Sequence, residues 1–161
     1  MEDIIHSSVI KELNENGWVL SKPVGKSMYP MLRYCKDPIV IEKPKRPFKV
    51  NDVPVYMKGK DRHFVMHRII GIKNGRYIIR GDNCIYSEYE ITDDDIVGIL
   101  TGFYRGDKFI DCEKNRLYKV YIVLNRVSYP LRLAWYRFKR VGSKVKRLLK
   151  KMFGVRQKNE K

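Results

Sequence analysis

The chain opens with apolar and polar positions that follow the period of an α-helix. Apolar residues recur at helical spacing, at Ile5, Val9, Ile10 and Leu13. This spacing places them on one face of a helix over residues 3–16. Gly17 follows directly, and glycine is the commonest residue just beyond a helix C-terminus. The pattern predicts a short N-terminal helix that ends at Gly17.

From residue 18 the pattern changes to short apolar runs separated by turn residues. The runs cover residues 18–24, 38–42, 53–58, 64–72, 76–80, 96–104 and 108–112. Asn74-Gly75 separates two of these runs, and an Asn-Gly pair in that position is the strongest short-range signal of an antiparallel hairpin. Arg105-Gly106-Asp107 predicts another hairpin between the last two runs. Many short strands joined by tight turns favour a mainly β fold, a compact domain of coiled antiparallel sheets, over an α/β sheet.

The last third of the chain returns to helical spacing. Residues 117–127 form one apolar segment, and Pro130 suits the first turn of a separate helix that follows it. Beyond Pro130 apolar residues recur at steps of three and four, at Leu131, Ala134, Trp135, Phe138, Val141, Val145, Leu148, Leu149 and Met152. Lysine and arginine occupy much of the remaining surface. The spacing predicts a basic amphipathic helix over residues 131–153.

Charge divides the chain at about the same place. Residues 1–113 contain 18 Lys/Arg and 17 Asp/Glu, whereas residues 114–161 contain 16 Lys/Arg and a single acid, Glu160. The chain has 161 residues, of which 43% are hydrophobic, which is enough for one ordinary core. We therefore expect a near-neutral domain over residues 1–113 and a basic helical tail over residues 114–161.

Cysteine usage and the N-terminus argue against several classes of protein. Cys35, Cys84 and Cys112 fit no CxxC or Cys/His pattern, so we expect free thiols and neither a metal site nor another cofactor. The N-terminus lacks a basic stretch followed by an apolar run, and no run of 18 apolar residues occurs. We therefore expect no signal peptide, no ordinary transmembrane helix and a cytoplasmic protein.

Three residues in the predicted β region could together form a catalytic site. Ser27 lies in VGKSMYP, and a serine hydroxyl is a weak nucleophile that needs a base within hydrogen-bond reach. His67 lies in FVMHRIIGI, where a strand would hold the imidazole rigidly. Asp82 follows the second strand of the predicted hairpin, so its carboxylate could accept the second imidazole N–H. Each also has an ordinary interpretation, as a turn serine, a half-buried strand histidine and a turn aspartate.

Four segments occur in the order found in the serine peptidases of the signal peptidase and LexA clan. They are GKSMYPML, NDVPVYMKG, VMHRII and RGDNC. The chain resembles this clan, and most closely its members with a histidine base, among them small soluble bacterial peptidases associated with peptide maturation. The resemblance implies a coiled antiparallel β fold with Ser27 as nucleophile, His67 as general base and Asp82 as assisting acid. It also implies that the substrate is a peptide or protein precursor with a leader or signal segment.

The resemblance extends to neighbouring positions and includes departures. It implies loop or oxyanion positions at Gly25, Lys26 and Met28, and groove or structural positions at Pro30, Asp52, Arg68, Gly81 and Asn83. Signal peptidases have a serine where this chain has Gly25, and that hydroxyl joins their oxyanion hole. Asn51 likewise replaces the glycine of the clan's glycine-aspartate pair. Losing one oxyanion donor costs on the order of 100-fold in rate, so we expect a slow or narrowly specialised enzyme.

The basic tail leaves alternatives open. A LexA-like regulatory domain, or a catalytically inactive one, could bind nucleic acid or a protein partner through the positive charge. The tail shows no helix-turn-helix, and we expect no specific nucleic acid partner. Its apolar positions fit packing on the β domain, or attachment of residues 131–153 to an anionic membrane surface such as the inner face of the plasma membrane.

Overall fold

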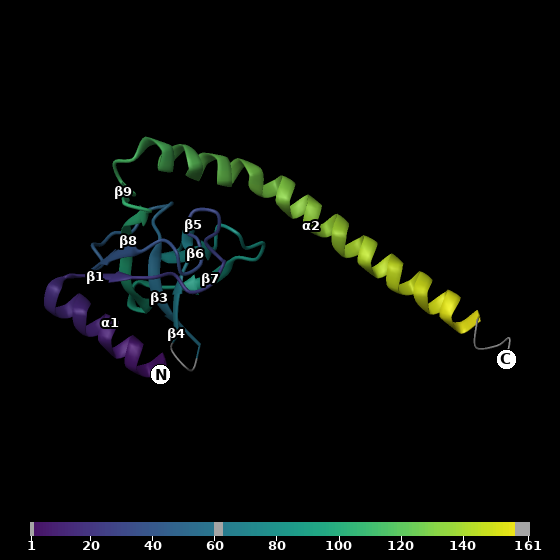
Figure 1. The fold of residues 1–161 in the computed structure, drawn as a ribbon, viewed down its shortest axis with the longest axis horizontal. Coiled ribbons are helices and arrows are strands. Elements are labelled where there is room, and N and C mark those ends of the chain that lie inside the picture. The colour runs from purple at the N-terminus through teal and green to yellow at the C-terminus, as the bar shows by residue number, and fades with distance from the viewer. Residues whose placement is uncertain (1, 60–62, 157–161) are drawn as a thin grey trace. The chain divides into compact units, whose positions relative to one another are not determined.

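The computed structural model of the protein describes residues 2–59 and 63–156. Helix α1 spans Glu2–Asn16, helix α2 spans Arg116–Arg156, and strands β1 to β9 lie between them (Figure 1). The chain divides into two compact units, Met1–Val123 and Leu124–Lys161. The first turns of α2 therefore belong to the β domain, and the division lies after Val123 rather than after residue 113.

The N-terminal helix agrees with the prediction from the sequence. Gly17 has a φ of 78°, in the left-handed region that glycine adopts without strain. Its N–H donates to the carbonyl oxygen of Leu13 at 3.1 Å. Leu13 is buried in the core, and Val9 packs against the same cluster. The predicted helix end is confirmed, and so is the position of Val9 and Leu13 on the face toward the core, whereas the side chain of Ile5 lies outside the described residues.

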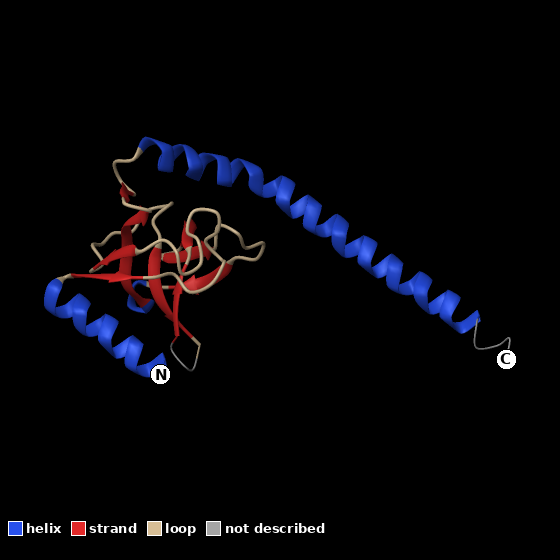
Figure 2. Ribbon diagram, in the orientation of Figure 1, coloured by secondary structure: helices blue, strands red, loops and turns tan. Residues whose placement is uncertain are grey.

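The larger sheet is antiparallel and runs in the order β1-β2-β8-β3-β4, with β9 also paired to β8 (Figure 2). Its strands are Trp18–Ser21 (β1), Ile39–Glu42 (β2), Pro54–Lys58 (β3), His63–Met66 (β4), Ile96–Arg105 (β8) and Lys108–Asp111 (β9). The long strand β8 pairs with β2, β3 and β9. Its Arg105↔Lys108 pair with β9 closes the second predicted hairpin.

The smaller sheet is antiparallel and runs in the order β5-β6-β7. Its strands are Arg68–Lys73 (β5), Arg76–Arg80 (β6) and Glu88–Ile91 (β7). Asn74 and Gly75 have φ values of 52° and 73°, and the flanking Lys73 pairs with Arg76, which confirms the predicted hairpin. Strand β7 is not predicted by the sequence pattern, because two glutamates in EYEI obscure its apolar positions.

The apolar run over residues 64–72 is two strands in two different sheets, not one strand. Met66 ends β4, which pairs with β3, and Arg68 begins β5, which pairs with β6. His67 is the single residue between them. The prediction that His67 lies within a strand is therefore wrong, because apolar periodicity continues through a point where the backbone changes sheets.

Two apolar clusters form the core. The first packs α1 and the larger sheet together with Met28, Met31 and Leu32 from the loop that includes Ser27. The second contains Phe48, Tyr56, Ile69, Tyr77, Ile79 and Ile96 and so lies where the smaller sheet meets β3 and β8. The fold is mainly antiparallel β with a helix at each end, and its first cluster fixes the Ser27 loop.

Helix α2 is continuous through Pro130, so the predicted break before that residue is wrong. Proline cannot donate to the carbonyl four residues earlier, but side chains support the turn beside it. Ser128 Oγ and Arg132 Nη2 both donate to the carbonyl oxygen of Asn125, at 3.1 Å and 3.2 Å. None of the helices in the described ranges combines the length and apolarity needed to cross a membrane.

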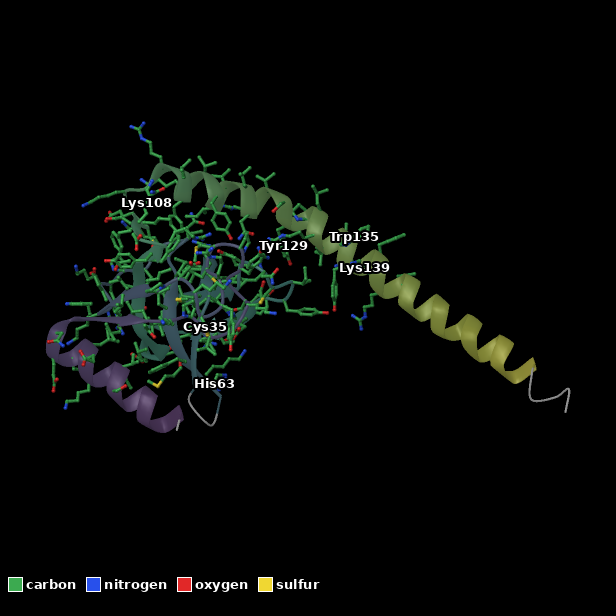
Figure 3. All side chains as sticks on the ribbon, in the orientation of Figure 1. Cys35, His63, Lys108, Tyr129, Trp135 and Lys139 are labelled. Atoms are coloured by element: carbon green, nitrogen blue, oxygen red, sulfur yellow. The ribbon has the colours of Figure 1, made fainter. Side chains whose placement is uncertain are left out.

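The predicted amphipathic stripe lies on this helix. Figure 3 labels Trp135 and Lys139 on α2, where Lys139 Nζ lies 5.1 Å from the centre of the Trp135 ring. The predicted stripe positions Val145, Leu148, Leu149 and Met152 fall in residues 143–156, whose side chains lie outside the described part of the structure.

Candidate functional site

The loop that presents Ser27 is fixed at its base and along its inner side. Cys35 donates its backbone N–H to the carbonyl oxygen of Pro23 at 3.0 Å, and Leu32 donates to that of Met28 at 2.9 Å. The side chains of Met28 and Leu32 are buried in the first core cluster, whereas Ser27 between the turns is half-buried. The sequence therefore uses apolar residues just after the serine to hold its backbone in place.

A buried carboxylate fixes the far side of the same loop. Asp37 is fully buried and accepts from the backbone N–H of Arg33 at 2.8 Å and from Arg33 Nη2 at 2.6 Å. Burial acts to raise the pKa of Asp37, but the hydrogen bonds from Arg33 and the charge of Arg105 hold it below its ordinary value. Arg105 also donates from Nη2 to the carbonyl oxygen of Met31 at 2.6 Å.

The predicted loop positions play different roles. Gly25 has a φ of 113°, so a side chain there would be strained. Lys26 is exposed, in agreement with a surface charge, and Pro30 is exposed as well. Met28 is a core residue. Gly25 and Met28 therefore set the conformation and the packing of the loop.

The turn after β6 binds the serine loop directly. Asn83 donates its backbone N–H to the carbonyl oxygen of Ser27 at 2.7 Å and its side-chain amide to that of Lys26 at 3.1 Å. A Cβ on Gly81 would lie 2.7 Å from the Ser27 carbonyl oxygen, 2.8 Å from Cys84 Sγ and 2.9 Å from His67 Cδ2. Only glycine fits there, so Ser27 and the His67 ring converge on one backbone position.

Sheet topology explains why these segments meet. His67 precedes β5, Gly81 follows β6, and Glu88 begins β7, so all three lie at the same end of the smaller antiparallel sheet. The pairs Arg68↔Arg80 and Ile79↔Glu88 set this register. The site is therefore built on strand ends, where the backbone is well fixed.

Glu88 orients the imidazole of His67. His67 is 9% exposed, and its Nδ1 lies 3.0 Å from Glu88 Oε1 and 3.1 Å from the Tyr56 hydroxyl oxygen. An ionised carboxylate only accepts hydrogen bonds, so this network assigns the proton to Nδ1 and leaves Nε2 with a free lone pair. Burial lowers the pKa of His67 below its ordinary value, although the Glu88 charge opposes the shift. The imidazole is thus neutral at pH 7, as a base must be.

Lys58 and Tyr56 keep Glu88 ionised. Lys58 Nζ lies 2.6 Å from Glu88 Oε2. Burial acts to raise the pKa of Glu88, but the hydrogen bonds from Lys58 and Tyr56 hold it below the ordinary value. Burial and the Glu88 charge together raise the pKa of Tyr56, which therefore stays a neutral phenol.

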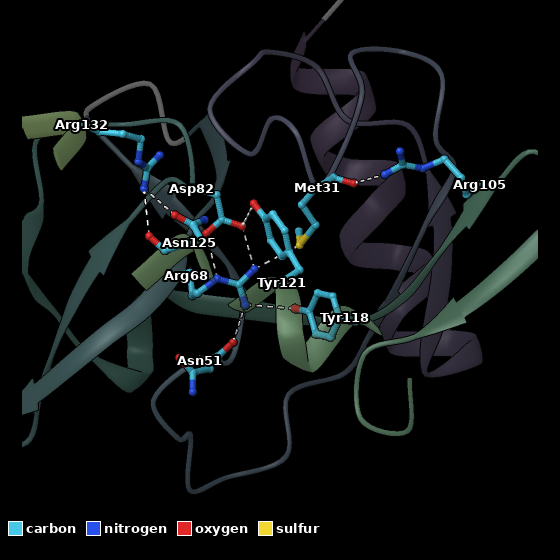
Figure 4. A network of polar contacts seen from close by, with 9 residues as sticks. All are labelled: Met31, Asn51, Arg68, Asp82, Arg105, Tyr118, Tyr121, Asn125 and Arg132. Carbon is cyan, nitrogen blue, oxygen red and sulfur yellow. Dashed lines mark hydrogen bonds and ion pairs between the residues drawn. The ribbon is translucent and has the colours of Figure 1, made fainter. Parts of the chain in front are cut away.

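Asp82 pairs with Arg68 instead of orienting His67, which corrects the expected role of this acid. Arg68 donates from Nε to Oδ1 at 2.8 Å and from Nη2 to Oδ2 at 2.7 Å, and Tyr121 donates to Oδ2 at 3.1 Å (Figure 4). Consecutive residues of an extended chain point to opposite sides. Because Arg68 pairs with Arg80, two residues before Asp82, the register puts Asp82 on the side of Arg68. Glu88 takes the expected place beside His67.

Arg68 connects the segments around the site. It donates from Nη1 to the carbonyl oxygen of Asn51 at 2.9 Å and to the Tyr118 hydroxyl at 3.0 Å. Its Nη2 also lies 3.0 Å from the sulfur of Met31, in the serine loop (Figure 4). Arg68 is 4% exposed. This expected groove or structural residue is structural, and its contacts reach the serine loop, the turn before β3 and the first turn of α2.

Asp52 supports the turn that Arg68 contacts. Its carboxylate accepts from the backbone N–H of Lys49 at 2.8 Å, and its carbonyl accepts from the N–H of Ile69 at 2.8 Å. Asn51 has a φ of 83°, a conformation that asparagine tolerates better than most residues with side chains. Asparagine at position 51 is therefore compatible with this turn.

Five residues around the site were not predicted from the sequence: Tyr56, Lys58, Glu88, Tyr118 and Tyr121. The first two alternate on β3 and so share one face, and the last two share a helix face at a spacing of three. These spacings are the features of the sequence from which the four residues could have been found. Glu88 has no such feature, because nothing in SEYEI distinguishes it from the exposed Glu90.

Other chemistry in the described part of the chain is limited. The three cysteines are free, and burial raises the pKa of both Cys84 and Cys112, which disfavours their thiolates. No group of three or more His, Cys, Asp or Glu side chains among the described residues could hold a metal ion.

Comparison with models of known protein families gives no match for this chain, and neither does comparison with curated proteins.

Proposed function

We propose that the protein is a serine endopeptidase of the signal peptidase type, which cleaves a leader or signal segment from a peptide or protein precursor. Ser27 would be the nucleophile, His67 the general base, and Glu88 the residue that positions His67. One observation supports this most directly: the Ser27 backbone and the Cδ2 edge of the His67 ring meet at Gly81 while the opposite nitrogen, Nδ1, is bound to Glu88.

The proposed reaction follows from this tautomer. Nε2 of His67 accepts the proton as Ser27 Oγ attacks the peptide carbonyl carbon, and Glu88 stabilises the resulting imidazolium. His67 then returns the proton to the leaving amine as the C–N bond breaks, which leaves an ester on Ser27. Water, deprotonated by the same nitrogen, hydrolyses this ester and restores the serine.

The oxyanion of this reaction would bind to backbone N–H groups. Among the described residues of the loop, the N–H groups of Tyr29, Leu32, Cys35 and Lys36 donate to carbonyl oxygens of the loop, whereas those of Ser27 and Met28 do not. Those two groups are the proposed oxyanion donors. Because Gly25 has no hydroxyl, we propose an oxyanion hole with one donor fewer than in the signal peptidases the chain resembles, and correspondingly slower turnover.

A serine-directed probe tests the proposal without a known substrate. A fluorophosphonate should phosphonylate Ser27 Oγ with loss of fluoride, and peptide mapping of the intact chain by mass spectrometry should place the adduct on Ser27. Ser27→Ala should abolish the adduct, whereas Ser21→Ala at the end of β1 should not change it. An unlabelled wild-type chain, or an adduct that persists in Ser27→Ala, would overturn the proposal and favour the alternative of a catalytically inactive, LexA-like regulatory domain.

The pH dependence of labelling should report the pairing of His67 with Glu88. The base must be neutral, so the rate should fall as the pH drops through the pKa of His67, below the ordinary value of about 6.5. Glu88→Gln removes a charge that stabilises the imidazolium. This change should move the acid limb to still lower pH and reduce the plateau rate by about 100-fold or more.

Matched variants separate positioning from general structural damage. Glu90→Gln changes an exposed carboxylate of the same strand, which pairs with Arg76, and should leave the profile unchanged. Glu88→Asp keeps the charge and should recover part of the plateau rate. A Glu88→Gln profile identical to that of the wild type would show that Glu88 does not position the base.

A further inference from the structure

The first turns of α2 have two faces of opposite character. Tyr118 is buried, and Tyr121 and Ile122 pack against the core of the β domain. Leu117, Val120 and Val123 lie on the other side of the same turns, and their exposed fractions are 77%, 54% and 59%. The apolar face of this segment therefore points away from the core that its other face covers.

In the second unit, taken by itself, exposed apolar side chains recur along α2 at steps of three and four. They are Leu124, Val127, Leu131, Trp135, Phe138 and Val141, and each is at least 60% exposed. Contiguous apolar exposure of this kind marks an interaction surface. We call this set the apolar stripe. It begins earlier in the chain than the predicted helix of residues 131–153, because Pro130 does not end α2.

The remaining side chains of α2 indicate what covers the stripe. Residues 116–142 include seven Lys/Arg and no Asp/Glu. Trp135 and Phe138 stack with ring centres 6.1 Å apart, and Lys139 lies over the Trp135 ring. Tryptophan beside lysine on an amphipathic helix is typical of the boundary between lipid headgroups and acyl chains. A nucleic acid would account for the charge but not for the apolar face.

We propose that α2 binds an anionic membrane surface, with the apolar stripe inserted below the headgroups and the basic side chains on the phosphates. The helix would lie in the plane of the surface rather than cross it. The attachment is reversible, since electrostatic attraction to lipid weakens as added salt screens it. This inference is independent of the proposed function, because binding to lipid requires neither Ser27 nor His67.

Vesicle binding by the full chain tests the proposal. In a Trp18→Phe background, Trp135 is the single tryptophan, so its fluorescence reports the stripe alone. Vesicles of equal parts phosphatidylcholine and phosphatidylglycerol should shift this emission to the blue, and brominated acyl chains should quench it. Affinity for neutral phosphatidylcholine vesicles should be at least about 100-fold lower, because each basic residue near the surface contributes about fivefold.

Matched variants identify the face that inserts. The variant Trp135→Gln/Phe138→Gln should bind the anionic vesicles with at least about tenfold lower affinity than the wild type, as measured by vesicle flotation. Tyr136→Gln, one residue along the helix but off the stripe, should change it by less than about twofold. Ser27→Ala should float like the wild type, which keeps this test separate from that of the proposed function.

Three results would overturn the proposal. The first is equal affinity for neutral and anionic vesicles. The second is a combination of two findings: the stripe variant binds vesicles as the wild type does, and the wild-type chain binds duplex DNA with an affinity that depends on Arg137 and Arg140. This combination would identify a nucleic acid surface. The third is that the lipid-free wild type sediments as a dimer while the stripe variant sediments as a monomer, which would identify a second copy as the partner.

Discussion

Replacing Ser27 with alanine is expected to reduce peptide hydrolysis by at least about 1,000-fold. The reason is that the backbone of Ser27 meets the Cδ2 edge of His67 at Gly81, and the hydroxyl of this residue is the proposed nucleophile. His67→Ala should cause a loss of similar size, because an alcohol without a base is a poor nucleophile. The measurement is kcat/KM on a fluorogenic peptide, whose sequence is selected from a proteome-derived pool by cleavage with the wild-type protein.

The double variant distinguishes a catalytic pair from two independent defects. Residues that act as one unit are strongly non-additive, so Ser27→Ala/His67→Ala should be hardly less active than either single variant. Circular dichroism should show that all three remain folded. Full activity of Ser27→Ala would remove the serine from the mechanism, and losses that multiply in the double variant would show that His67 acts somewhere other than on Ser27.

Local patterns predicted much of the fold. Helix α1, its end at Gly17, and the hairpins at Asn74-Gly75 and residues 105–107 depend on neighbours in the sequence and on glycine conformation. The break at His67 depends on pairing with two different sheets, which residues 64–72 do not encode as a change in period. The continuity of α2 through Pro130 likewise depends on contacts of neighbouring side chains that helix propensity does not contain.

The candidate site was predictable to a similar extent. Ser27, His67 and Gly81 were identified in the sequence, and the structure brings them together. The assignment of the acid was wrong, because a hairpin brings two residues near each other without specifying which side of the strand each occupies. The register Arg68↔Arg80 decides that Asp82 meets Arg68, and Glu88 reaches His67 only through a strand whose polar sequence concealed it.

Replacing Arg68 with methionine is expected to lower the free energy of unfolding by about 3–5 kcal/mol. The cause is the carboxylate of Asp82, which is 4% exposed and would lose both of its hydrogen bonds from the guanidinium. The Asn51 carbonyl and the Tyr118 hydroxyl would lose a donor as well. Urea unfolding followed by circular dichroism measures the change. Arg46→Met, which breaks an exposed pair with Asp93, should cost less than about 1 kcal/mol.

The loss of stability in Arg68→Met should come mainly from burying the Asp82 carboxylate without a cationic partner. The lost attraction between Arg68 and Asp82 should contribute less. Removing one partner of a buried ion pair leaves an uncompensated charge, whereas removing both charges is often close to neutral. Asp82→Asn in the Arg68→Met background should therefore recover a large part of the loss, and the two single changes should sum to more than the double one. Because Arg68 also contacts the serine loop at Met31, the recovered double variant should remain slow in hydrolysis although it is again stable. Simple additivity of the two changes would mean that Arg68 and Asp82 stabilise the domain through separate contacts.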